Sequence, residues 1–133
     1  AIIREQVKVQ GGYEVKSQGD GFMLAFSSAR RALACAIDIQ RALAAHAEKE
    51  PDDAVRVRIG LHTGEAIIDA GDFYGRHVNL AARIGGAANG GEVLVSSLLR
   101  ELTLSSGEFT FDEGRDVELK GLAGTHRVYA VMW

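Results

Sequence analysis

The stretch EVKSQGDGFMLAF, Glu14 to Phe26, contains two short runs separated by Gly19 and Asp20. Asp and Gly are favoured in tight β-turns, and a two-residue Gly-Asp connection between alternating runs is typical of a β-hairpin. The pattern therefore predicts paired strands at Tyr13 to Ser17 and Gly21 to Phe26. Turn chemistry alone accounts for a carboxylate at the tip of such a hairpin.

The segments on either side of this hairpin have helical spacing. Ile3 and Val7 precede a Gly-Gly stop, which predicts a helix that begins in mid-pattern, as in a fragment whose upstream part is missing. Ser28 is placed to cap a second helix that runs to about His46. Five residues are candidates for the buried side of that helix: Ala29, Leu33, Ala36, Leu43 and Ala47.

The clearest strand is VRVRIGLH, Val55 to His62, in which apolar and polar residues alternate. Thr63-Gly64 then turns the chain into a second strand, Glu65 to Asp69. The remaining elements expected are a helix from Gly75 to about Ala87, a strand from Gly91 to Ser96, a short helix through Leu102, and strands near Phe109, near Val117 and from His126 to Met132. Mixed helices and frequent hairpins predict an α+β sandwich with a largely antiparallel sheet.

The bulk composition excludes several classes of protein. A length of 133 residues suits one domain. The net charge of −3 gives no broad positive surface potential of the kind that attracts nucleic acid. No apolar run approaches the ~20 residues of a membrane span, so direct membrane contact by this domain is not expected. The single cysteine, Cys35, excludes an internal disulfide and fits a reducing, cytoplasmic compartment. Its alanine-rich surroundings predict a small buried hydrophobic residue.

The least ordinary segment is DFYGRHVNLAARIGG, Asp72 to Gly86, which is apolar almost all round and is expected to be largely buried. Asn79 and Arg83 nevertheless stand four residues apart on one stripe of the helix. An internal Asn–Arg network that pins the helix explains them. A paired donor site for an anionic ligand explains them equally well, because the planar guanidinium matches phosphate oxygens.

Other polar residues carry weaker signals. Lys120 lies at the end of a strand in VELKGLAG, where a lysine is usually a solvated edge charge. The four histidines, His46, His62, His77 and His126, show no metal-ligand spacing and are interpreted as surface or edge residues. The chain has no Walker A sequence, so any nucleotide must be held by another device.

Taken together, five motifs resemble the catalytic domain of the class III nucleotidyl cyclases, most closely that of bacterial homodimeric adenylyl cyclases. In chain order they are KSQGDGFMLAF, VRVRIGLHTGE, DFYGRHVNLAARI, GGEVLVS and VELKG. The resemblance covers nearly the whole chain, so residues 1–133 are expected to form one such domain with a ferredoxin-like α+β fold. It implies conversion of ATP to 3′,5′-cyclic AMP and pyrophosphate.

The resemblance implies a role for each candidate residue. Asp20 matches a metal-binding aspartate, Lys16 and Asp72 match the pair that reads the purine, and Lys120 matches the lysine that contacts the terminal phosphates. The catalytic pair is matched by Asn79, which orients the ribose, and Arg83, which stabilises transition-state charge. The resemblance also implies two Mg²⁺ or Mn²⁺ ions per site and a head-to-tail homodimer with sites at the interface.

The identity of the base can be examined from chemistry. Adenine offers an acceptor at N1 and a donor at its 6-amino group, which suit the ammonium of Lys16 and the carboxylate of Asp72. Guanine has the opposite polarity at these positions. The pair therefore favours ATP over GTP.

One departure from the family leaves alternatives open. The family's first metal aspartate lies in a strand upstream of the first helix, and that strand is absent here. Asp20 alone is a poor basis for two-metal catalysis. A catalytically silent cyclase homology domain acting as a regulatory dimer module remains an alternative, as do a diguanylate cyclase and a non-enzymatic binding domain. Membrane tethering of a longer parent protein is left open.

Overall fold

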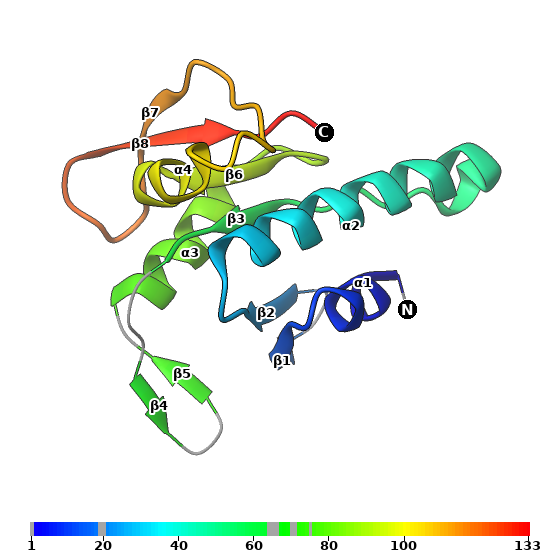
Figure 1. Cartoon of the computed structure of the whole chain (residues 1–133), viewed down its shortest axis with the longest axis horizontal. Helices are drawn as coiled ribbons and strands as arrows, with labels where there is room; N and C mark the ends of the chain where they lie inside the picture. The colour runs from blue at the N-terminus through cyan, green and yellow to red at the C-terminus, as the bar shows by residue number, and fades with distance from the viewer. Residues whose placement is uncertain (1, 19–20, 64–66, 70–71, 75) are drawn as a thin grey trace.

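The structure is a computed structural model that describes residues 2–18, 21–63, 67–69, 72–74 and 76–133. In chain order its elements are α1 (Ile2–Val9), β1 (Tyr13–Gln18), β2 (Gly21–Ala25), α2 (Ala29–Lys49), a 3₁₀ turn (Pro51–Asp53), β3 (Ile59–Leu61), β4 (Ile67–Asp69), β5 (Asp72–Tyr74), α3 (Arg76–Ala87), β6 (Val93–Ser96), α4 (Ser97–Leu104), β7 (Arg115–Glu118) and β8 (Thr125–Ala130). Figure 1 shows their arrangement.

The largest sheet has the strand order β3-β6-β8-β7. β3 and β6 are parallel, whereas β8 is antiparallel to both β6 and β7. The predicted hairpin is confirmed, because β1 and β2 pair antiparallel in a sheet of their own. β4 and β5 form a further two-stranded sheet, which extends from the body of the molecule in Figure 1. The expected α+β fold with a largely antiparallel sheet is confirmed.

Helices cover both faces of the four-stranded sheet. α2 and α4 lie over one face, with Leu33 and Leu99 buried against Val93 and Val95 of β6. α3 lies over the other face. The buried residues between α3 and the sheet are Ile84, Ala88, Leu94, Leu119 and Val128. Because every residue of β6 is buried, this strand forms the centre of the core.

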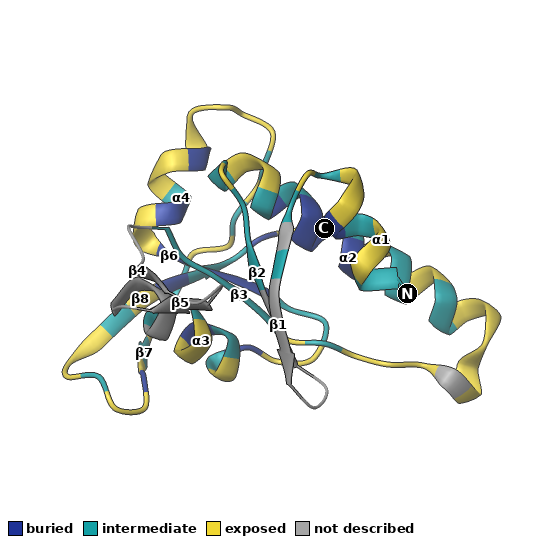
Figure 2. Ribbon diagram, turned by 90° about the horizontal axis from the view of Figure 1, so that it is seen from below, coloured by how far each residue is buried: buried dark blue, intermediate teal, exposed yellow. Residues whose placement is uncertain are grey.

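Helix α2 joins the sheet to the β1–β2 hairpin. Its N-cap is Ser28, as predicted, and the Ser28 hydroxyl accepts a hydrogen bond of 3.3 Å from the Arg31 amide. Leu33 and Ala36 are buried as expected, and so is Cys35, which is only 1% exposed. The far half of α2 projects beyond the sheet and is largely exposed (Figures 1 and 2).

Burial also explains the chemistry of Cys35. Burial, together with the nearby Asp38 carboxylate, raises the pKa of the thiol to about 11. The thiolate is therefore scarce at neutral pH, in keeping with a packing role.

Two of the expected strands are much shorter in the structure. The strand predicted from Val55 to His62 is only Ile59–Leu61, because its partner β6 begins opposite Ile59. The Val57 carbonyl instead accepts hydrogen bonds from the Gln40 side chain and the Gly91 amide, and Val55 is 55% exposed. The strand expected near Phe109 is reduced to a single bridge between Phe111 and Val131.

The strand expected at Glu65 to Asp69 corresponds to β4, and its pairing differs from the expected one. β4 pairs with β5, not with the strand before it, and β5 occupies Asp72–Tyr74, just before the helix that was expected from Gly75. No strand was expected there, because three consecutive residues are too few for periodicity to identify one. Within the residues described, no helix is long and apolar enough to cross a membrane.

Candidate functional site

The loop between β7 and β8 is packed against α3. Leu119, which is 3% exposed, belongs to the same buried cluster as Ile84 of α3, which is 1% exposed. Leu122 of the loop and Leu80 of the helix pack against this cluster. The apolar residues of the loop therefore fix its position relative to α3, and with it the position of Lys120.

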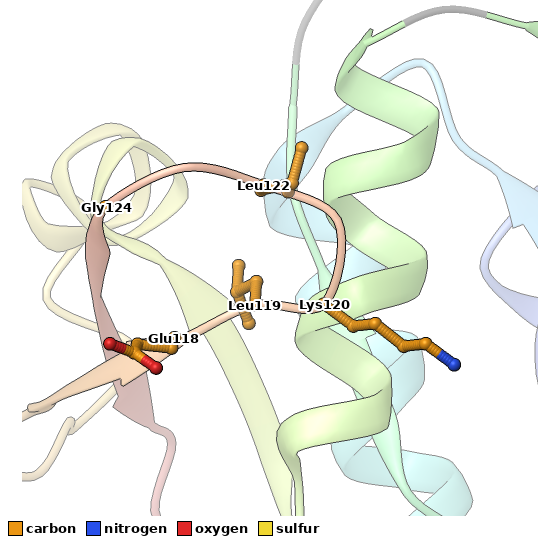
Figure 3. Close-up of a pocket in the computed structure, with 5 residues that line it drawn as sticks. All are labelled: Glu118, Leu119, Lys120, Leu122 and Gly124. Atoms are coloured by element: carbon orange, nitrogen blue, oxygen red, sulfur yellow. The ribbon is translucent and has the colours of Figure 1, made fainter.

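Lys120 itself is exposed, although its neighbour Leu119 is buried. Figure 3 shows Lys120 and Glu118 pointing to opposite sides of the loop. The two residues, with Leu119, Leu122 and Gly124, line an open hollow of about 440 Å³. An exposed ammonium beside a hollow can receive an anionic group without a desolvation cost as large as that of a buried cation.

Helix α3 presents Arg83 to solvent. The expectation that this helix is largely buried is wrong for one side, because Ala82, Arg83 and Gly86 are all exposed, whereas Ile84 is buried. Small residues made the helix look apolar all round, but they do not require burial. Asn79 lies one turn before Arg83 in the same helix.

The predicted purine-reading residues lie on neighbouring strands. Lys16 belongs to β1 and Asp72 belongs to β5, and these two strands are in contact although they belong to different sheets. In the β4–β5 ladder, Asp72 stands directly opposite Asp69. The backbone therefore brings Lys16 and Asp72 to adjoining elements from positions that are far apart in sequence.

The four elements that carry the candidate residues form a continuous row. β1 contacts β5, β5 contacts α3, and α3 carries the buried cluster that holds the β7–β8 loop. Along this row the order is Lys16, Asp72, then Asn79 and Arg83, then Lys120.

An ion pair fixes the strand that leads into this loop. Arg115, the first residue of β7, donates two hydrogen bonds of 2.8 and 3.0 Å to the two carboxylate oxygens of Glu92, just before β6. The Asn89 amide donates a third hydrogen bond, of 3.0 Å. The bond from the guanidinium is the main cause that lowers the pKa of Glu92, against the opposing effect of burial.

The remaining candidate, Asp20, lies outside the described residues. Among the residues that the structure describes, no group of three or more His, Cys, Asp or Glu side chains is arranged to hold a metal ion. A carboxylate such as Asp20 is a hard oxygen donor of the kind that Mg²⁺ takes together with substrate phosphates. Its chemistry suits a divalent cation, but the described part of one chain does not form a metal site by itself.

Sequence reasoning missed the environment of two histidines. His62 was expected at the surface or an edge, yet its Nδ1 lies 2.7 Å from the buried hydroxyl of Ser96. His126 is half-buried, and its Nε2 is buried without a hydrogen-bond partner among the residues that the structure describes. The alternation in VRVRIGLH pointed to the face on which His62 lies, but no sequence signal identified Ser96 as its partner.

A model of the adenylate and guanylate cyclase catalytic domain matches residues 1–132. The chain belongs to this family. The chain is 36% identical over 137 residues to an adenylate cyclase of Mycosarcoma maydis. The matched region covers 84% of the chain and 5% of that protein. It is 31% identical over 122 residues to a putative adenylate cyclase 3 of Rhizobium meliloti, covering 91% of the chain and 21% of that protein.

Solved structures of cyclase domains have the same fold. An adenylate/guanylate cyclase/hydrolase from Silicibacter pomeroyi superposes with a TM-score of 0.88 at 30% identity, covering 96% of this chain and 75% of that one. An adenylate cyclase from Trypanosoma brucei, described in its monomeric state, superposes with a TM-score of 0.81 at 25% identity, covering 98% and 74%. The cyclase family is in general metal-dependent.

Proposed function

We propose that this domain is an adenylyl cyclase that converts ATP to 3′,5′-cyclic AMP and pyrophosphate. The observation that carries the proposal is the row of contacting elements β1, β5, α3 and the β7–β8 loop. ATP presents its base, ribose and phosphates in that order. The row offers base-reading residues, then ribose and α-phosphate residues, then a cation for the terminal phosphates, also in that order.

Each residue has one chemical task in this proposal. Lys16 donates to adenine N1 and Asp72 accepts from the 6-amino group. Asn79 orients the ribose so that its 3′-oxygen attacks the α-phosphorus in line, and the bond to the pyrophosphate oxygen breaks. Arg83 stabilises the charge that develops around the α-phosphate, and Lys120 holds the terminal phosphates.

Divalent cations complete the proposed site. Two Mg²⁺ or Mn²⁺ ions, held with the help of Asp20, would lower the pKa of the 3′-hydroxyl and offset charge on the phosphates. Asp20 is the one metal ligand that the sequence motif supplies.

A homodimer is part of the same proposal. The β4–β5 hairpin pairs with no other strand in the part of the chain that the structure describes. An isolated two-stranded hairpin is marginally stable in water. Its backbone register pairs Ile67 with Tyr74 and Ile68 with Phe73. A second copy related by a two-fold axis would give the hairpin a partner and place two equivalent sites at the interface.

Product analysis tests the proposal. The intact protein is incubated with ATP or GTP and Mg²⁺ or Mn²⁺, and cyclic nucleotides and pyrophosphate are quantified. We expect cyclic AMP and pyrophosphate in equal amounts, and far less cyclic GMP. A protein that dimerises and binds ATP but forms no product would instead be a silent cyclase homology domain.

A further inference from the structure

The carboxyl end of β3 holds a polar contact that the proposed reaction does not use. His62 directly follows β3, and Ser96 is the last residue of β6, the parallel neighbour of β3. The register Leu61–Val95 places His62 and Ser96 side by side, and their Nδ1 and Oγ atoms are 2.7 Å apart. Ser96 is 6% exposed, so the contact is shielded from water.

Ser96 also caps the following helix. Its Oγ accepts a hydrogen bond of 3.2 Å from the Leu99 amide at the start of α4. The same oxygen lies 2.7 Å from His62 Nδ1, so it links the histidine ring to the start of α4. Such contacts satisfy a buried hydroxyl.

His62 lies at the level of the catalytic helix turn. Gly60, two residues earlier in the strand, touches the backbone of α3 at Ala81 and Gly85. The β4–β5 hairpin joins the carboxyl end of β3 to the amino end of α3, so α3 runs back along the strand (Figure 1). Two residues of a strand span about 6.6 Å, which is about the length of four residues of an α-helix. Side chains at alternate strand positions share a face, so His62 is level with the turn that carries Asn79.

We propose that His62 is a positioning residue for the cyclase site: held by Ser96, it sets the position of the α3 turn that carries Asn79. This inference rests on the proposed function for its effect on turnover. The placement of the helix turn is a property of the fold and can be measured without activity.

Turnover and matched substitutions test the role. His62→Ala should lower kcat about ten- to a hundred-fold, because a displacement of about 1 Å in a catalytic group has effects of this size. The KM for ATP should change less than about threefold, since other residues hold the base and phosphates. His62→Asn keeps a hydrogen-bonding atom near the Nδ1 position and should recover most of kcat. His62→Gln places its amide near the Nε2 position and should not. His46→Ala, on the outer part of α2, controls for loss of a histidine.

A double substitution tests whether Ser96 and His62 act together or independently. If Ser96 acts by holding His62, then His62→Ala combined with Ser96→Ala should be no slower than His62→Ala alone. Full additivity of the two effects would overturn the proposal, as would recovery by His62→Gln but not by His62→Asn. An unchanged kcat in His62→Ala, with the parent protein active, would overturn it as well.

Nuclear magnetic resonance provides a readout that does not depend on activity. Ser96→Ala should change the imidazole nitrogen shifts of His62, because it removes the contact between the two side chains. The amide shifts of residues 76–80 should change in His62→Ala. They should change less in His62→Asn, which keeps a hydrogen-bonding atom near Ser96, and should stay the same in His46→Ala. An inactive parent protein would contradict the proposed function. Unmoved amide shifts in His62→Ala would contradict the positioning role.

Discussion

Gly60 of β3 and Gly85 of α3 are in direct backbone contact. A Cβ atom added to Gly60 would lie 2.1 Å from the Gly85 nitrogen and 2.8 Å from the Ala81 carbonyl oxygen. Neither neighbour is the end of a flexible side chain, so the helix would have to move. Glycine at position 60 therefore determines how closely α3, with Asn79 and Arg83, approaches the sheet.

We predict that Gly60→Ala destabilises the fold by about 1–3 kcal/mol, the usual range for overpacking, and lowers cyclase activity by more than its effect on folding explains. Gly86→Ala is the matched control, because a Cβ there meets no atom within 4 Å. That change should stabilise the helix by up to about 1 kcal/mol. Urea unfolding and turnover of both variants check the prediction. Equal stability of the two variants would contradict the close contact.

Lys120 gives a second prediction. Lys120→Ala should raise the KM for ATP about tenfold or more while the melting temperature stays the same, since the side chain is exposed and Leu119 anchors the loop. Lys120→Arg should retain part of the binding because it keeps the charge. Lys8→Ala, another exposed lysine, is the control for net charge. A KM for ATP that is unaffected by Lys120→Ala would remove this residue from phosphate binding.

The base-reading pair gives a third. Lys16→Glu combined with Asp72→Cys should weaken the use of ATP, because each unpaired polar group in the site costs about 1–3 kcal/mol. Kinetics with both nucleotides measure the change in the ATP/GTP ratio of kcat/KM. If that ratio stays as it was, the two residues do not read the base.

The fourth prediction concerns pH. Because Arg115 lowers the pKa of Glu92 in the folded state, the pair stabilises the fold above the carboxyl's unfolded pKa of about 4.3, and this contribution is lost as the pH falls through the lower folded value. The free energy of unfolding should therefore decline more steeply with acidification, below about pH 5, in the parent protein than in Glu92→Gln. Urea unfolding between pH 3 and pH 7 provides the comparison. Parallel curves would contradict a stabilising pair.

The sequence predicted the elements whose signals are local. The β1–β2 hairpin followed from Gly19-Asp20, and the Ser28 cap followed from its position before an apolar run. The length of β3 did not follow, because it depends on where its partner β6 begins. The exposure of Arg83 did not follow either, since small residues around it can face water or protein equally well.

The candidate site shows the same division. Family motifs marked Lys16, Asp20, Asp72, Asn79, Arg83 and Lys120 from the sequence, but no local pattern indicates that β1 lies against β5 or that Leu119 packs with Ile84. The contact between His62 and Ser96 joins the residue after β3 to the last residue of β6, so it becomes visible only once the parallel pairing of β3 and β6 is known.

An adenylyl cyclase site built between two copies of the domain is tested most directly by subunit complementation. Asp20→Asn and Asn79→Ala should each be nearly inactive in the intact protein. If one copy supplies Asp20 and the other supplies Asn79, then one of the two sites in a mixed dimer is fully intact.

Random mixing makes about half of the dimers mixed, each with one good site of two, so co-expression should restore about a quarter of the parent activity. Cyclic AMP production is measured for each variant alone and for the mixture, with mixed dimers verified by two affinity tags. We expect recovery to about a quarter of the parent activity. No recovery in verified mixed dimers would contradict it, because a site built within one chain would always retain one of the two substitutions.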